Sequence, residues 1–98
     1  MTQTAALAVL AGIAASDAAC CAVLGRRARG QDHQQATELL VGITPGGPAM
    51  ARDLGRLLGI KDDAHHGLLD VGSLRARQAL RCAGHLLAAA ERQVRVRG

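Results

Sequence analysis

Residues 4–24, TAALAVLAGIAASDAACCAVL, decide the fold because they contain a single charged residue, Asp17, and no proline. Ala and Leu are strong helix formers, so this stretch predicts one helix that ends at Gly25. Because the helix is apolar on nearly every side, we expect it at the centre of a helical bundle. Its length would also span a bilayer. The chain begins without the basic segment of a signal peptide, however, and Asp17 interrupts the apolar run, so we expect no contact with a membrane.

A second helix is predicted after a basic loop at residues 26–30. Asp32 and Gln35 have the spacing of a capping box, which opens a helix. Residues 44–47, TPGG, form a strong break, and Pro48 suits the first turn of the helix that follows. The residues of the second helix that are expected to face the core are Ala36, Leu39, Leu40 and Ile43.

The third helix is expected to stop at Gly59 and to resume as a short helical turn over residues 61–66. After a last loop, Ser73 caps a long fourth helix. Every segment has a helical period, so the sequence predicts an all-α fold: a four-helix (four to five) up-and-down bundle in a single domain over residues 1–98. Its core is expected to contain Met50, Leu54, Leu57 and Leu58 of the third helix and Ala79, Leu80, Ala83, Leu86, Leu87, Ala90 and Val94 of the fourth.

The core must be built without aromatic rings, because the chain has no Phe, Tyr or Trp. Its apolar residues are mainly 20 Ala, 14 Leu, 6 Val and 3 Ile. Small side chains bury little area, at about 25 cal/mol per Å². We therefore expect modest monomer stability and a homodimer that buries a second apolar face. The lack of aromatic rings also argues against single-strand binding by base stacking.

Cys20, Cys21 and Cys82 are an odd number of cysteines, and neighbours on a helix cannot bridge each other. A reducing, cytoplasmic compartment fits this pattern best, with the thiols as small core residues. The chain has no Cys-x-x-Cys and no two histidines spaced to share a helix face. We therefore expect no metal and no cofactor.

The net charge is +4, from 11 Arg and one Lys against 8 acidic residues. Such an excess can attract phosphate groups. Arg26, Arg27 and Arg29 in the first loop are candidate phosphate contacts, which would not distinguish one nucleotide sequence from another. The alternative is a solvated loop. A second basic stripe, with the same alternative, is predicted on the fourth helix at Arg77, Arg81 and His85.

Residues 61–67, KDDAHHG, are the densest polar cluster in the sequence. Lys61, the only lysine, is a candidate phosphate ligand, and His65 or His66 could transfer protons near neutral pH. Asp62 is a candidate for orienting these groups. The alternative is a solvated helix junction whose Lys–Asp pair contributes little to stability.

Asp17 needs a partner, because burying an unpaired carboxylate is costly. We hypothesise that Asp17 faces residues 61–66 across the bundle and orients them. The alternative is a solvent-facing edge or a hydrogen bond to a hydroxyl such as that of Ser16.

Three stretches of the chain resemble the HEPN superfamily (higher eukaryotes and prokaryotes nucleotide-binding). Residues 57–67, LLGIKDDAHHG, are similar to a Leu-Lys-x-x-Ala-His-Tyr-Gly pattern that follows the third helix of small actinobacterial HEPN-like proteins. Residues 13–18, IAASDA, and residues 30–33, GQDH, look similar as well. Together these stretches extend the resemblance over most of the chain.

The resemblance implies a four- or five-helix up-and-down bundle that is commonly dimeric and often linked to toxin–antitoxin or other defence systems. Catalytic members of the family are metal-independent ribonucleases, in which an Arg holds the scissile phosphate and a His transfers protons at the dimer interface. By this resemblance Lys61 takes the Arg position and Asp62 the polar position. His66 takes the His position or, in a second register, His65 does.

Lys61 in place of an arginine cannot form the bidentate hydrogen bonds that a guanidinium makes to a phosphate. Arg27 and His33 have a similar spacing but lie outside the expected position of the family site. We therefore expect a module that binds nucleic acid or a nucleotide phosphate without catalysis, in a toxin–antitoxin or defence-type system. The first alternative is an antitoxin-like or dimerising regulator with a cognate protein partner and no affinity for polyanions. The second is a weak metal-independent ribonuclease, which requires a histidine facing Lys61.

Overall fold

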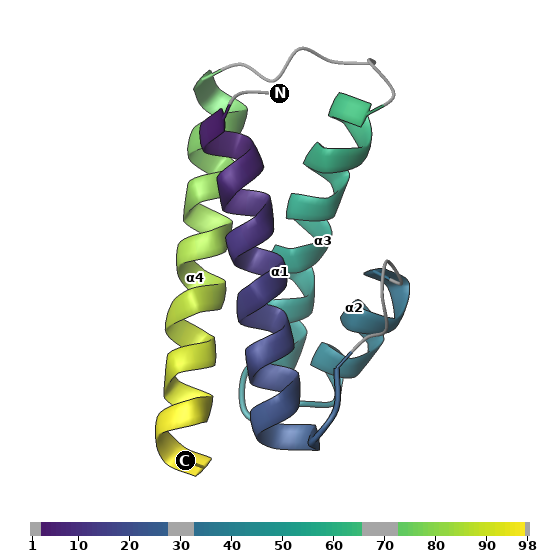
Figure 1. Cartoon of the computed structure of the whole chain (residues 1–98), viewed down its shortest axis with the longest axis vertical. Helices are drawn as coiled ribbons and strands as arrows, with labels where there is room; N and C mark the ends of the chain where they lie inside the picture. Colours follow the sequence, from purple (N-terminus) through teal and green to yellow (C-terminus); the bar gives the residue numbers. More distant parts are fainter. Residues whose placement is uncertain (1–2, 28–32, 66–72, 98) are drawn as a thin grey trace.

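The computed structural model describes residues 3–27, 33–65 and 73–97, which form four α-helices (Figure 1). No strand occurs in these three ranges, so the predicted all-α four-helix bundle is confirmed. The helices are α1 (Gln3–Leu24), α2 (His33–Val41), α3 (Gly47–His65) and α4 (Ser73–Arg97).

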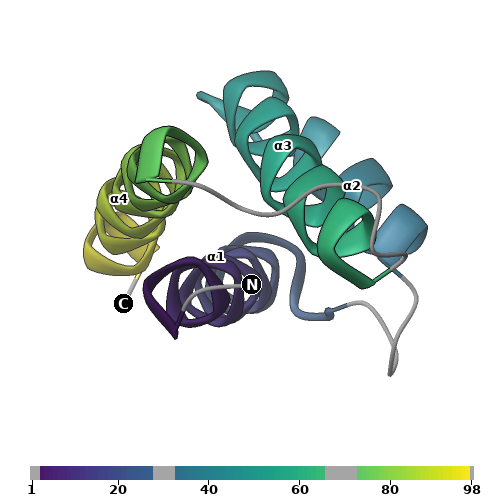
Figure 2. The same cartoon turned by 90° about the horizontal axis from the view of Figure 1, so that it is seen from above.

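The three long helices lie side by side, and the short α2 packs on the outer side of α3 (Figure 2). α1 and α4 run in the same direction, and α3 runs opposite to both (Figure 1). The most extensive helix contact is between α1 and α4. The C-terminal end of α3 therefore lies at the same end of the bundle as the N-terminal ends of α1 and α4.

The buried face of α1 carries small side chains, which let it approach both α3 and α4. A Cβ placed on Gly12 would meet the side chains of Leu57 in α3 and Leu86 in α4. One turn later, the hydroxyl of buried Ser16 donates to the carbonyl oxygen of Gly12 at 2.8 Å, so its polar group is satisfied within the helix. Three helices thus converge at Gly12. The apolar core residues of α1 are Ala5, Ala8, Val9, Ala15, Ala19 and Cys20.

Gly59 does not interrupt α3, so that part of the sequence prediction is wrong. The helix continues to His65 and includes most of the turn expected over residues 61–66. Gly59 faces solvent with open space around it. An isolated glycine in a helix costs about 1 kcal/mol. The burial of Leu57 and Ile60 on the opposite side of the helix outweighs this cost.

The first helix is buried on one side only, contrary to the expectation of a fully surrounded helix. Leu7 and Leu10 of α1 are 65% and 63% exposed. α1 is also long and apolar enough to cross a membrane, a property that it shares with core helices of soluble proteins. The exposed side of α1 is thus an apolar surface rather than a polar one.

The apolar residues of α4 divide between two faces. Leu86 is fully buried, as expected, whereas Leu80, Leu87 and Val94 are 51%, 44% and 44% exposed and not in the core as predicted. Neighbouring residues such as Leu86 and Leu87 point about 100° apart. A helix with apolar residues at adjacent positions therefore cannot bury all of them against one side. The predicted core residues of α3 are buried, apart from Leu58, which is partly exposed. Those predicted for the second helix are buried as well, although Ile43 lies in the loop after α2 and not on the helix.

Gly12→Val is expected to lower the free energy of unfolding by about 1–3 kcal/mol, because the added side chain must displace Leu57 and Leu86. Urea unfolding followed by circular dichroism measures this loss. Gly55→Val is the matched control, since Gly55 lies on the exposed side of α3 with nothing within 4 Å of an added Cβ. Its stability should stay unchanged or rise slightly, because Val has a higher helix propensity than Gly. Equal losses in the two variants would contradict the close approach at Gly12.

Candidate functional site

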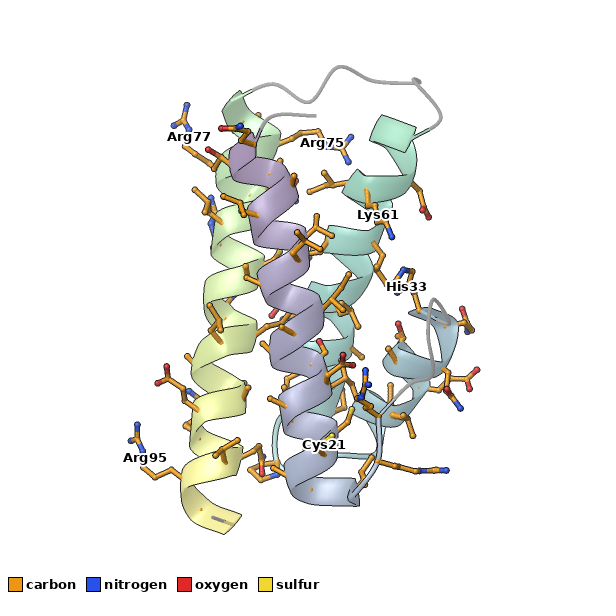
Figure 3. The ribbon with its side chains drawn as sticks, viewed as in Figure 1. Cys21, His33, Lys61, Arg75, Arg77 and Arg95 are labelled. Carbon is orange, nitrogen blue, oxygen red and sulfur yellow. The ribbon has the colours of Figure 1, made fainter. Side chains whose placement is uncertain are left out.

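A lysine and a histidine from different helices meet beside the start of α2. The Nζ of Lys61, near the C-terminal end of α3, lies 3.1 Å from Nε2 of His33, the first residue of α2 (Figure 3). Both side chains are partly exposed. The contact joins residues that lie 28 positions apart in the sequence. The sequence placed His33 outside the expected site, whereas the structure places it directly beside Lys61.

This pair has the chemistry to bind an anion. The ammonium group of Lys61 has three N–H donors, of which at most one points at Nε2 of His33, so the others are open to a ligand. The N-terminal end of α2 adds backbone N–H groups and the positive end of the helix dipole. A phosphate oxygen at this position could accept from Lys61 and from a ring N–H of His33.

Asp17 contacts the first loop in place of the hypothesised contact with Lys61. Its Oδ2 lies 3.6 Å from a guanidinium nitrogen of Arg27, and the two side chains are 30% and 63% exposed. The reason is the direction of the helices: α1 and α3 run antiparallel, so Lys61 lies toward the N-terminal end of α1 and Asp17 toward the other (Figure 1). An exposed pair of this kind contributes about 0–1 kcal/mol to stability. Asp17 is therefore paired with Arg27, which is itself a candidate phosphate contact.

The structure describes only some of the remaining predicted site residues. Arg26 and Asp62 are exposed. Arg29 and His66 lie outside the described residues, as does the side chain of His65. The structure therefore brings together two pairs of candidate residues, Lys61 with His33 and Asp17 with Arg27.

A second polar cluster, between α3 and α4, was not predicted from the sequence. Asp53 is 5% exposed, and its Oδ2 lies 3.7 Å from Nδ1 of His85, within range of an ion pair when the ring is protonated. The sequence did hold a signal for it. Asp53 follows Met50 by three residues and precedes Leu57 by four, so it falls on the core-facing side of α3, where a carboxylate needs a partner.

Two of the three free thiols, those of Cys20 and Cys82, are buried and have raised pKa values. Burial raises the pKa of the Cys20 thiol to about 11. Burial and then the carboxylate of Asp53 raise the pKa of Cys82, although Arg56 acts in the opposite direction. Cys21 is exposed, so the expectation that all three thiols lie in the core is wrong for this residue. Within the described parts of the chain, no three His, Cys, Asp or Glu side chains are grouped to hold a metal ion.

Comparisons with protein-family models, with curated proteins and with solved structures found no match to this chain. The class of protein that the fold defines is an all-α four-helix bundle.

The thiol environments predict that one cysteine per folded chain reacts with Ellman's reagent at mildly alkaline pH. Cys21 is expected to react because it is exposed. Cys20 and Cys82 should react only after unfolding, because they are buried and their raised pKa values keep them protonated. Cys21→Ser should abolish the reaction of the folded protein. If a thiol of the folded Cys21→Ser variant still reacts fast, the core around Cys20 or Cys82 opens readily.

Proposed function

We propose that this chain is a HEPN-like module that binds nucleic acid or a nucleotide through phosphate groups, without cleaving it, as part of a toxin–antitoxin or defence-type system. The observation that carries the proposal is the 3.1 Å contact between Lys61 and His33 at the N-terminal end of α2. An ammonium group, an imidazole and a helix N-terminus together suit a phosphate oxygen. The residues come from two separate stretches that both resemble the same family.

The charges of the first loop support the same function. Arg26 and Arg27 follow the end of α1 and are exposed, and the side chain of Arg27 is 63% exposed despite its contact with Asp17. These groups can bind phosphates of a longer ligand without reading its bases. Because the chain has no Phe, Tyr or Trp, it lacks the large aromatic side chains on which bases usually stack. Phosphate contacts therefore supply the proposed affinity, which should fall steeply as salt rises.

Lys61→Gln is expected to weaken the binding of fluorescently labelled RNA by about tenfold, which corresponds to the loss of one charge-assisted hydrogen bond. The slope of log affinity against log salt should fall by about one as well. His33→Gln should weaken binding to a smaller extent, because the amide can replace the ring as a hydrogen-bond donor. Fluorescence anisotropy at several salt concentrations measures the affinities of both variants and the salt slope. Unlabelled ATP and inorganic phosphate as competitors show whether a single nucleotide is enough.

Arg77→Gln is the matched control: it removes one positive charge from a side chain that points away from α3 (Figure 3), and it tests the alternative that the predicted stripe at Arg77 and Arg81 is only a solvated helix face. It should lower RNA affinity by less than about twofold, through long-range charge alone. Circular dichroism checks that helix content is unchanged in every variant. The proposal fails if wild type does not bind polyanions, or if Arg77→Gln weakens binding as much as Lys61→Gln does.

A second candidate function, metal-independent ribonuclease, is favoured by one specific observation. That activity requires a histidine facing Lys61, and His33 does so at 3.1 Å. Lys61 would hold the phosphate while His33 takes the proton of the ribose 2′-hydroxyl as that oxygen attacks phosphorus; the 5′-oxygen of the next nucleotide leaves and takes a proton from water. Cleavage of RNA in EDTA that is lost in His33→Gln, with binding retained, would assign this activity. Binding without cleavage would leave the non-catalytic function.

We also propose that the protein is a homodimer formed through the outer surface of α1 and α4. We call this surface the α1–α4 face. Its residues are Leu7, Leu10, Ala14 and Ala18 of α1 and Leu80, Leu87 and Val94 of α4. The three from α4 are spaced seven apart, the repeat of a helix seam that packs on another helix. Leu7 and Leu10 are more than half exposed, which is a large apolar surface for a single chain.

The shape and charge of the α1–α4 face suit a second copy of the same chain. A groove of about 470 Å³ runs between the small residues Ala14 and Ala18 and the larger Leu87 and Val94, so projecting leucines of a partner could enter it. Glu91 and Arg95 lie along the groove, 3.9 Å apart and mostly exposed. In a twofold arrangement, each acidic residue of one copy can meet the basic residue of the other, which makes the surface complementary to itself.

Leu87→Asp is expected to convert the wild-type dimer to a monomer, or to raise the dimer dissociation constant at least about tenfold, because it places a charge in the apolar interface. Light scattering coupled to size-exclusion chromatography measures the mass. Val41→Asp is the control: Val41 is 54% exposed but lies on α2, outside the α1–α4 face. A monomeric wild type, or a dimer that Leu87→Asp leaves intact, would overturn the proposal.

A further inference from the structure

A groove lies between the first turns of α3 and the second half of α4. Its volume is about 520 Å³, within the range of ordinary small-molecule sites. The floor is aliphatic and includes Ala49 and Met50 of α3 and Ala88 and Ala89 of α4. Met50 is 2% exposed and Ala89 9%, so the floor is continuous with the core. We call this the α3–α4 groove; it lies at the opposite end of α3 from Lys61.

One wall of the α3–α4 groove is the loop between α2 and α3, and this loop is firmly held. Gln93 of α4, which is 7% exposed, donates from Nε2 to the carbonyl oxygen of Pro45 at 3.1 Å. The backbone N–H of Gly47 donates to the carbonyl oxygen of Ile43 at 3.0 Å. A Cβ on Gly47 would strike the carbonyl oxygen of Leu40, so the loop packs directly on the end of α2. The groove is therefore formed before any ligand enters.

The polar side chains that line the α3–α4 groove are mainly cations or hydrogen-bond donors. Arg52 lines the groove from α3 and Arg92 lines it from α4, and both residues are exposed. His85 lies two helical turns before Arg92, about 10 Å along α4. Asp53 is the one carboxylate among the lining residues. It is buried and faces Nδ1 of His85, which leaves Nε2 on the far side of the ring from the carboxylate.

We propose that the α3–α4 groove binds a small amphipathic anion, with an aliphatic body on the Ala/Met floor and a carboxylate or phosphate head held by Arg52 and Arg92. Guanidinium groups bind both kinds of head through paired N–H donors. The floor offers methyl and methylene groups and no aromatic ring, so it favours a saturated chain over a stacked base. The groove is separate from the Lys61–His33 pair, so this site and the proposed phosphate site can be tested independently of each other.

The sequence supplies a reporter for this site. Met1 and Met50 are the only methionines, so methyl-¹³C-methionine labelling gives one NMR signal from the groove floor and one reference signal. Met50→Leu assigns the two signals. Decanoate, kept below its micelle-forming concentration, is expected to shift the Met50 signal saturably and to leave the Met1 signal unchanged. Decyl phosphate in place of decanoate shows which head is preferred. Decanol, which lacks the charge, and acetate, which lacks the chain, should each bind at least about tenfold more weakly.

Two double variants test the role of the arginines. Arg52→Gln/Arg92→Gln should weaken the binding of the preferred anion by about tenfold or more. Arg77→Gln/Arg81→Gln removes the same charge from exposed residues of α4 that do not line the groove, and should change the affinity by less than about twofold.

An unshifted Met50 signal would overturn the proposal, as would equal binding of decanol and decanoate. Equal losses in the two double variants would also overturn it. Since RNA binding is measured separately through Lys61, failure here leaves the proposed phosphate-binding function intact, and the converse holds as well.

Discussion

The lack of aromatic side chains constrains every other part of the structure. A core of Ala, Leu, Val and Ile reaches the packing density of a protein interior only if its helices approach closely. They do so at Gly12, where α1 meets Leu57 of α3 and Leu86 of α4. This close approach buries one narrow side of α1. The same residue types make up its other side, which is why Leu7 and Leu10 stay exposed. The tight core and the apolar outer surface thus have one origin in the composition.

Helical periodicity was enough to predict the four helices and the all-α class, because apolar spacing and breaks such as residues 44–47 are local properties of the chain. Two features were not predictable in this way. Gly59 weakens a helix locally, but the tertiary packing of Leu57 and Ile60 decides that the helix continues. For α4, periodicity could not choose between the two apolar sides, since that choice depends on where α1 and α3 lie.

The candidate site was predictable only in part for the same reason. Lys61 stood out as the single lysine in a polar cluster, and the sequence could show that much. Its partner His33 is 28 positions away, and the contact depends on how α2 packs against α3. The partner of Asp53 is 32 positions away, and that contact depends on the register of α3 against α4. Sequence spacing identifies neighbours within one helix, whereas contacts between helices follow from packing.

Opposite sides of α4 carry different chemistry, which makes the proposed interactions compatible. At about 100° per residue, His85 and Arg92 face away from the side that holds Leu80, Leu87 and Val94. A second copy on the α1–α4 face would therefore leave the α3–α4 groove open. The pair of Lys61 and His33 lies on α2 and α3, which contribute nothing to that face. A dimer would thus carry two phosphate sites, and one nucleic acid chain long enough to reach both would be held more tightly than by either site alone.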